Sequence, residues 1–316
     1  MHKALLLVII LLATAGVWYV SQNYELVGID QIRLVPKGSS RTAAGPARTG
    51  DLIRIASFNI QTLGRAKLAK PKVVERLAEI IRQFDVIAVQ EVRSRHQDIL
   101  PRLIEYVNAG GRRYDFVLGP RVGRTRQKEQ FAFLFDTETI EVDRFQVYAV
   151  DDPSDLLHRP PLVAPFRVRG VPANEAFTFT LVNVHVDPDE VSREIRWLPD
   201  LFRAVLNDGR GEDDVIVLGD FNADDRKLAA ALAGLPSATV VLESTPTNVR
   251  MTAQYDNILL LLPASREYTG RSGVFDILRT FNLTQDEALQ ISDHNPVWAS
   301  FSVREGGPAS SLAVAP

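Results

Sequence analysis

The stretch VIVLGDFNAD, residues 215–224, carries the pattern on which the fold assignment depends. Its first four residues are aliphatic and mostly β-branched, which predicts a buried strand over Val215–Leu218. Two polar side chains, Asp220 and Asn222, follow the strand closely. Layered α/β proteins collect functional groups at strand ends, because strand tips converge while the adjoining loops stay accessible. The stretch therefore predicts one edge of a functional site.

The same pattern recurs along the chain, where further strand candidates end in a polar side chain. These ends are Asn59 in SFN, Glu91 in VIAVQE, His185 in LVNVH, Asp256 in YDN, and Asp293 with His294 in SDHNP. Together with the first stretch they supply four carboxylates, two amides and two imidazoles. Each group alone has a plain structural explanation, such as a turn-forming Asn or a hydrogen-bonded structural His. Their repetition at strand ends throughout the domain favours a shared site.

Short β-branched or aromatic runs alternate with segments of helical periodicity. This alternation predicts a layered α/β domain with a substantial content of sheet. Further strands are expected over residues 52–59, 86–90, 131–135, 177–184, 257–262 and 297–303, and helices over residues 72–83, 198–206 and 228–233.

Composition excludes several classes of site. The chain has 316 residues, of which 46% are hydrophobic and 24% charged, as in ordinary globular proteins. Its formal net charge of -3 excludes a basic clamp, so any contact with nucleic acid must come from a local patch. There is no cysteine, which excludes thiol nucleophiles, cysteine-based zinc sites and disulfides. An exported chain of this kind fits a bacterial envelope protein better than an animal secreted protein.

The N-terminal residues 1–22 are predicted to be an export signal. After Lys3, residues 4–20 are apolar without a charge. This length leaves two interpretations open: an uncleaved membrane anchor, or a cleaved signal peptide with Ala13 and Ala15 marking the cleavage site. We expect an extracytoplasmic protein, secreted or periplasmic if the leader is cleaved and anchored to the membrane by a single N-terminal helix if it is not.

Composition also divides the remainder of the chain. Residues 23–50 are predicted to be a linker, because PKGSSRTAAGPARTG at its end is rich in Gly, Pro, Ser and Ala and has no apolar periodicity. Residues 51–304 are expected to form one folded domain, and residues 305–316 a disordered tail of similar loose composition. We expect the protein to be a monomer.

The polar groups at the strand ends indicate a particular chemistry. Carboxylate and amide oxygens without cysteine predict a site for a hard cation, Mg²⁺ or Mn²⁺, rather than for zinc. Histidines among such ligands suit proton transfer and charge stabilisation at a phosphoryl centre. Phosphodiester hydrolysis is the reaction that this set of groups serves best.

Taken in order, seven motifs resemble those of the endonuclease/exonuclease/phosphatase superfamily: SFNIQTLG, FDVIAVQEVRSRH, GRTRQKEQFAFLF, NVHVDP, VIVLGDFNAD, YDNIL and ALQISDHNPV. Within the superfamily, QEVR, KEQFAFLF and LTQDEALQISDHNP are most similar to deoxyribonuclease I. The resemblance covers about residues 52–303. It implies a four-layer α/β sandwich, in which two mixed β-sheets pack face to face with helices outside, and a catalytic cleft at one edge.

The resemblance also implies roles for the motif residues. The implied metal ligands are Glu91, Asn59 and Asp293, with Glu91 as the principal carboxylate. The implied catalytic groups are two histidines, the carboxylates that orient them, and a pair that positions water and phosphate: His185 with Glu129, His294 with Asp256, and Asp220 with Asn222. A carboxylate beside an imidazole fixes its tautomer and favours its protonated form. The sequence does not decide which histidine is the acid.

Four arginines are candidates for substrate contact. Arg93 and Arg159 match basic positions that contact the substrate in the deoxyribonucleases. Arg124 and Arg126 lie in the basic loop 121–128, where they are candidates for phosphate contacts, although a solvated charged loop is the plain alternative.

Two departures from deoxyribonuclease I bear on DNA contact. That enzyme has an arginine just after its FNI motif and a tyrosine just before its KE motif, both of which reach into the minor groove. This chain has Gln61 and Gln127 instead. We therefore expect its DNA contact to depend mainly on phosphates.

The sequence thus predicts a metal-dependent phosphodiesterase, an extracytoplasmic DNA endonuclease of deoxyribonuclease I type, with Ca²⁺ as a further candidate ion beside Mg²⁺ or Mn²⁺. One alternative is the same chemistry on a phospholipid or inositol phosphate, as in sphingomyelinases, which a membrane tether would suit. Another is a non-catalytic binding module of the same fold. That module would have lost catalytic positions, and all of them are present.

Overall fold

A computed structural model describes residues 24–27, 33–36, 50–125, 128–235, 237–262 and 264–307. The chain divides into two compact units, Met1–Ala44 and Gly45–Pro316. The predicted leader segment, residues 4–20, lies outside the described residues. Within the described ranges, no helix is both long enough and apolar enough to cross a membrane.

The described residues of the first unit form a strand pair. Strand β1 (Tyr24–Val27) pairs antiparallel with β2 (Arg33–Pro36). Both strands fall within the stretch that composition assigned to a linker, where the sequence predicted no strand. The predicted tether that follows, residues 37–49, lies outside the described residues.

The second unit contains two mixed sheets. The first has six strands in the order β14-β15-β3-β4-β6-β5. Their bounds are β3 (Leu52–Leu63), β4 (Val86–Val92), β5 (Tyr114–Leu118), β6 (Gln130–Asp136), β14 (Tyr268–Val274) and β15 (Val297–Ser302). Strands β3 and β4 are parallel, and the other neighbours are antiparallel.

The second sheet has seven strands, with six in the order β12-β13-β11-β10-β9-β7 and β8 paired to β9. Their bounds are β7 (Ile140–Val142), β8 (Tyr148–Ala149), β9 (Leu162–Val168), β10 (Thr178–His185), β11 (Val215–Asp220), β12 (Ala238–Val240) and β13 (Asp256–Leu261). Strands β10 and β11 are parallel, whereas β11 and β13 are antiparallel.

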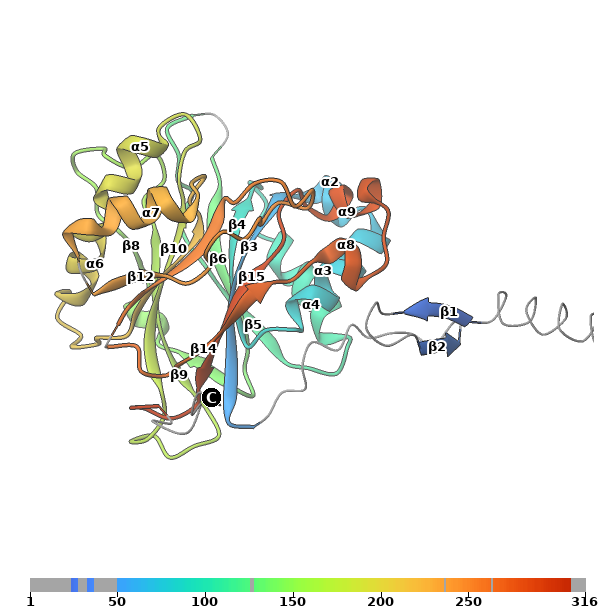
Figure 1. The fold of residues 1–316 in the computed structure, drawn as a ribbon, viewed down its shortest axis with the longest axis horizontal. Helices are drawn as coiled ribbons and strands as arrows, with labels where there is room; N and C mark the ends of the chain where they lie inside the picture. The colour runs from blue at the N-terminus through green and yellow to red at the C-terminus, as the bar shows by residue number, and fades with distance from the viewer. Residues whose placement is uncertain are drawn as a thin grey trace, which may run out of the picture. The chain divides into compact units, whose positions relative to one another are not determined.

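Helices cover the outer face of each sheet (Figure 1). On the first sheet lie α2 (Arg65–Leu68), α3 (Pro71–Ile81), α4 (Ile99–Asn108), α8 (Ile277–Thr280) and α9 (Gln285–Ile291). On the second lie α5 (Val191–Glu194), α6 (Leu198–Leu206) and α7 (Asp225–Ala231). Short 3-10 turns occur at Arg144–Gln146, Ile195–Trp197 and Leu232–Gly234. The predicted four-layer sandwich is confirmed.

The layer between the sheets is a continuous apolar core. Phenylalanines from both sheets stack within it: the Phe166 and Phe179 ring centroids lie 5.6 Å apart, and those of Phe177 and Phe301 lie 5.8 Å apart. Strand side chains alternate between this core and the helix-covered face, so one strand contributes to two layers. Ile55 of β3, for example, belongs to the inter-sheet core, whereas its neighbour Ala56 faces the helices.

One polar pair crosses this apolar layer. Gln90 of β4 donates through Nε2 to Asn183 Oδ1 of β10 at 2.7 Å, and to Ser57 Oγ at 3.0 Å. Asn183 in turn donates to the carbonyl oxygens of Val89 and Ala132, at 3.1 and 3.0 Å. Hydrogen bonds in a dry interior depend strongly on geometry, so this amide pair fixes how the two sheets face each other.

Candidate active site

Three neighbouring strands of the second sheet place a row of polar side chains at one edge. His185 ends β10 and lies opposite Asp220, which ends β11. Asp220 lies opposite Asp256, the first residue of the antiparallel strand β13. The strand-end pattern in the sequence therefore corresponds to real proximity.

The glycine of the GDFN motif allows this edge to form. A Cβ atom on Gly219 would lie 2.0 Å from the carbonyl oxygen of Val184 in the neighbouring strand. Real Cβ atoms do not approach a carbonyl oxygen so closely, so any other residue here would separate β10 from β11. Gly219 thus holds Asp220 in register with His185.

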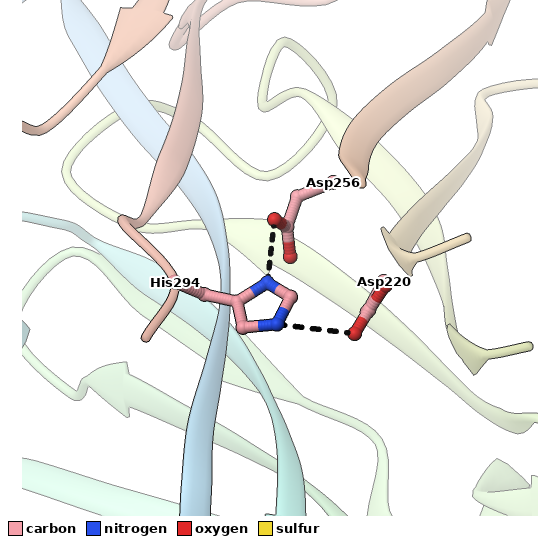
Figure 2. Close-up of side chains that lie close together, drawn as sticks. All are labelled: Asp220, Asp256 and His294. Atoms are coloured by element: carbon pink, nitrogen blue, oxygen red, sulfur yellow. Dashed lines mark hydrogen bonds and ion pairs between the residues drawn. The ribbon is translucent and has the colours of Figure 1, made fainter. Parts of the chain in front are cut away.

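Asp220 contacts both histidines, and Figure 2 shows its carboxylate facing the His294 ring on the side away from Asp256. Its Oδ2 atom is 3.5 Å from His185 Nε2 and 3.7 Å from His294 Nε2. The same oxygen accepts a hydrogen bond of 2.9 Å from Asn59 Nδ2. Its Oδ1 atom accepts one of 2.9 Å from the backbone N–H of Asn222. Both imidazoles thus face a single carboxylate that the backbone holds in place.

Besides Asp220, each histidine has a carboxylate of its own that contacts Nδ1 of the ring. Glu129 Oε1 lies 2.7 Å from His185 Nδ1, and Asp256 Oδ2 lies 2.8 Å from His294 Nδ1. The pairs implied by the resemblance are therefore present. The Nδ1 atom of each ring is held by its partner, while Nε2 lies on the side of Asp220.

The charges favour protonated imidazoles. Burial opposes protonation of His294, but Asp256 and Asp220 outweigh it and raise its pKa to about 10. Burial likewise opposes protonation of His185, but Glu129 and Asp220 outweigh it and raise its pKa. Burial alone would raise the pKa of Glu129, yet His185 and the nearby arginines lower it. At neutral pH the His294 ring is therefore an imidazolium, and the carboxylates around His185 favour its protonated form as well.

Glu91 is oriented by an unusual backbone. Its Oε2 atom accepts hydrogen bonds from the backbone N–H and the hydroxyl of Thr62, at 2.8 and 3.1 Å. Four residues around the site adopt left-handed φ values: Gln61 at 52°, Thr62 at 59°, Glu91 at 64° and Asn222 at 48°. Such conformations are costly for residues other than glycine and persist where surrounding contacts impose them.

Lys67 joins the two chain segments that flank Glu91. Its ammonium donates to the carbonyl oxygens of Ile60, Gln61 and Ile291, the last two at 2.6 and 2.7 Å. Burial lowers its pKa to about 8, although Glu91 and Asp293 oppose this shift. No sequence pattern indicated Lys67, because its partners are backbone oxygens, one of which lies 224 positions away in the chain.

Thr247 is a second residue that sequence reasoning missed. Its hydroxyl donates to Asp256 Oδ2 at 2.7 Å and accepts from the backbone N–H groups of Tyr255 and Asp256, at 2.9 and 3.1 Å. The hydroxyl therefore fixes the carboxylate that supports His294. Threonine is common in loops, so no pattern distinguished it.

The residues present fit a hard cation beside Glu91. Asn59 donates through Nδ2 to Glu91 Oε1 at 3.4 Å and to Asp220 Oδ2 at 2.9 Å, while its Oδ1 accepts a hydrogen bond from the backbone N–H of Gln61. Asp293 lies nearby with its side chain 48% exposed, and its Oδ1 is 3.9 Å from His294 Nε2. The carboxylates of Glu91 and Asp293 are the oxygen donors that Mg²⁺ prefers, and Asn59 would join them through its Oδ1.

A second grouping of possible ligands fits a proton better than a metal. Ligand atoms of Asp220, Asp256 and His294 all lie within 4.8 Å of one another. His294, however, is hydrogen-bonded to Asp256 and has a raised pKa. A protonated imidazole cannot bind a metal, so these three residues form a proton-holding group.

Arg93 and Arg159 contact the site's own carboxylates. Arg93 Nη2 lies 3.2 Å from Glu91 Oε1 and 3.5 Å from Glu129 Oε2. Arg159 is only 9% exposed, and its Nε lies 3.3 Å from Glu129 Oε2. Both guanidinium groups therefore help to hold the carboxylates in place, in addition to any contact with a substrate.

Arg124 is also paired within the protein. Its Nε lies 2.9 Å from Asp155 Oδ1, and its Nη1 lies 3.0 Å from Glu190 Oε2. These carboxylates must be displaced before Arg124 can contact a phosphate. The other two loop residues singled out from the sequence, Arg126 and Gln127, lie outside the described residues.

Comparison with known proteins identifies the family of the chain that carries this site. The sequence profile of the Endonuclease/Exonuclease/phosphatase family matches residues 56–275. The chain belongs to this family.

Relatives within the family include deoxyribonucleases. The chain is 30% identical over 279 residues to human deoxyribonuclease-1-like 1, covering 85% of this chain and 90% of the relative. It is 30% identical over 270 residues to deoxyribonuclease-1 of Bos taurus, covering 80% and 94%. A crystal structure of an endonuclease/exonuclease/phosphatase family protein from Bacteroides thetaiotaomicron matches with a TM-score of 0.56 at 16% identity, over 80% of this chain and 98% of that one. The last likeness concerns the fold alone.

Proposed function

We propose that this family member is a divalent-metal-dependent DNA endonuclease that acts outside the cytoplasm. One observation carries the proposal: the Asp220 carboxylate lies 3.5 and 3.7 Å from two histidine Nε2 atoms, and each histidine has its own supporting carboxylate. Such an arrangement supplies a proton acceptor and protonated donors within one small volume, as hydrolysis of a phosphodiester requires.

Asp220 and the histidines divide the proton transfers between them. Asp220, held by the Asn222 N–H, orients the attacking water and accepts its proton as the new P–O bond forms. As the opposite P–O bond breaks, one of the imidazolium groups of His185 and His294 gives its proton to the leaving 3'-oxygen. The other neutralises charge on a phosphate oxygen in the transition state.

Glu91, Asn59 and Asp293 would hold the metal ion. When bound, a divalent cation supplies positive charge to a phosphate oxygen. Arg93 keeps Glu91 in position through its ion pair, and Thr62 does so through two hydrogen bonds. These contacts fix the carboxylate before any ion arrives.

DNA as the substrate is supported by the relatives, which carry the name deoxyribonuclease at about 30% identity over most of the chain. Location outside the cytoplasm is supported by the apolar leader in residues 1–22. An uncleaved leader would place the enzyme at a membrane, where we expect it to act as a monomer.

The test compares substrates with the full chain. Supercoiled plasmid, RNA, sphingomyelin and a chromogenic bis-phosphodiester are each incubated with Mg²⁺, with Mn²⁺ and with a chelator. We expect metal-dependent nicking of the plasmid. Cleavage of sphingomyelin in preference to plasmid would replace the proposal with its lipid alternative.

Glu91→Gln tests the metal ligand directly. The change removes the negative charge and keeps the shape, so we expect the fold to remain and metal-dependent nicking to fall by at least about a hundredfold. The exposed Glu138 provides the matched control, and Glu138→Gln should nick at the parent rate. Near-normal activity of Glu91→Gln at saturating Mg²⁺ would remove Glu91 from the site.

A further inference from the structure

Three carboxylates meet at the end of the second unit opposite the active site. Asp214 immediately precedes β11, Glu267 immediately precedes β14, and Glu305 follows β15. One oxygen of each lies within 4.8 Å of the others. We call Asp214, Glu267 and Glu305 the carboxylate clasp.

The clasp is separate from the active site. Strand β11 begins beside Asp214 and ends at Asp220, and its six residues span about 20 Å. Strand β15 likewise separates Glu305, which follows it, from His294, which precedes it. The clasp therefore lies at the far ends of two strands whose near ends carry catalytic groups.

The clasp also lies where the two sheets are joined by the C-terminal segment. Arg304 forms an isolated antiparallel bridge with Ala176, which lies two residues before β10 of the second sheet. Glu305 Oε2 then accepts a hydrogen bond of 3.1 Å from the backbone N–H of Thr178, the first residue of β10. Asp214 leads into β11 of the second sheet, whereas Glu267 leads into β14 of the first. A group bound here would contact both sheets.

Within the described part of the chain, the negative charge of the clasp has no counter-charge. Among the ion pairs of the described residues, none joins these three carboxylates to Lys, Arg or His. The charged neighbours are further acids, Glu212 and Asp213. Burial, reinforced by Glu267, raises the pKa of Asp214 to about 8. Buried anions without a partner are costly, so either protons or a cation must neutralise them.

Two oxygens of the clasp are available as ligands. Asp214 Oδ1 and Glu267 Oε2 are buried and accept no hydrogen bond from a donor group of any described residue. Both residues are only 1% exposed. A proton shared between these two carboxyls would neutralise one charge and would leave Glu305 and the neighbouring acids uncompensated. A divalent cation would satisfy both oxygens and the third carboxylate together.

We propose that the carboxylate clasp binds a divalent cation and thereby joins the two sheets at the end opposite the active site. Ca²⁺ is the preferred ion, because it accepts carboxylates in flexible geometry and tolerates mixed ligands such as the nearby Ser265 hydroxyl. The site is independent of the nuclease activity proposed above.

The experiment measures Ca²⁺ binding and thermal unfolding of the full chain. All proteins carry Glu91→Gln, so that the principal active-site ligand is absent, and are freed of metal with a chelator. CaCl₂ is then added at pH 8 in isothermal titration calorimetry and in parallel melts. We expect Ca²⁺ to raise the melting temperature of this parent. Asp214→Asn and Glu267→Gln should each bind Ca²⁺ at least about tenfold more weakly.

A second result distinguishes a cation site from a merely structural contact. In chelator, Asp214→Asn should melt above the parent, because it lacks the buried charge that destabilises the metal-free protein. The exposed-residue control Glu138→Gln should respond to Ca²⁺ as the parent does. If Asp214→Asn does not fold, Glu305→Gln provides the same comparison at the least buried member of the clasp.

Two outcomes would overturn the proposal. One is an equal Ca²⁺ response in the parent and in the clasp variants. The other is a parent that ignores Ca²⁺ while its stability falls between pH 5 and 8, which would show that protons alone neutralise the clasp.

Discussion

Each residue of the active site depends on another that holds it. His185 and His294 share Asp220 and have separate supporting carboxylates, Glu129 and Asp256. The two histidines were predictable because their motifs lie at strand ends. Lys67 and Thr247 were not predictable, because both contact backbone groups, and such contacts produce no pattern in the sequence.

The shared carboxylate predicts non-additive losses. His185→Ala or His294→Ala should each lower kcat of nicking by about a thousandfold or more, because each removes a proton donor or a charge-neutralising group. The double variant should lose far less than the product of the two single losses, since both rings act on one phosphate. Single-turnover kinetics on plasmid provide the measurement. Wild-type turnover in His185→Ala would return that residue to a structural role.

The raised pKa of His294 predicts a pH dependence with a definite sign. Its pKa is about 10 in the folded protein, against about 6.5 for an unperturbed histidine. Its contribution to stability is therefore fully present below about pH 6.5 and is lost as the pH rises through 10. Nicking that needs the imidazolium should likewise fall on the alkaline side.

Asp256→Asn should move this alkaline decline to lower pH, because it removes the carboxylate that most strongly raises the pKa of His294. A pH-rate profile, with an NMR titration of the His294 ring, would check the shift. A profile unchanged in Asp256→Asn would contradict the assignment of the pair.

At the scale of elements, strands with apolar runs were predictable and edge or interrupted strands were not. The helix expected over residues 198–206 matches α6, and β10 and β11 lie within two residues of their predicted bounds. Strand β9 contains Pro165, which sequence rules treat as a break. Strand β14, YTGRSGV, is an edge strand with two glycines and only one aliphatic residue. Strands β9 and β14 form because neighbouring strands pair with them, and this pairing is not visible in the local sequence pattern.

The amide pair between the sheets should matter for stability. Asn183→Ala would leave Val89 O, Ala132 O and Gln90 Nε2 without their partner in a dry core, at a cost of about 2 to 4 kcal/mol. Urea unfolding followed by circular dichroism would measure it. Asn207→Ala provides the control, since Asn207 caps α6 at the exposed surface. A loss for Asn183→Ala no larger than for this control would contradict the role assigned to the pair.

At the scale of the whole molecule, the low net charge restricts attraction for DNA to local groups of basic residues. The net charge of -3 offers no general attraction, so nicking should weaken as salt is added through the loss of local phosphate contacts. Loop composition alone favoured Arg124 as such a contact. The structure instead pairs Arg124 with Asp155 and Glu190, a pairing that composition could not reveal.

Arg124→Gln therefore should leave the salt dependence of nicking almost unchanged, because the side chain already has carboxylate partners. Arg93→Gln should lower activity at every salt concentration, because it also releases Glu91. Rates on one plasmid from low to moderate NaCl provide the comparison. A clearly flatter slope in Arg124→Gln would show that the loop reaches the DNA after all.

The hydrogen bonds between Gln90 and Asn183 also limit how this protein can be recombined with its relatives. A crossover placed between β4 and β10 takes the two amides from different parents. If one parent has an apolar residue at its position, the chimera buries a lone amide between its sheets, even when both parents are stable. Libraries made by gene shuffling should therefore recover few folded members with a mismatched pair, and crossovers outside residues 90–183 should be tolerated more often.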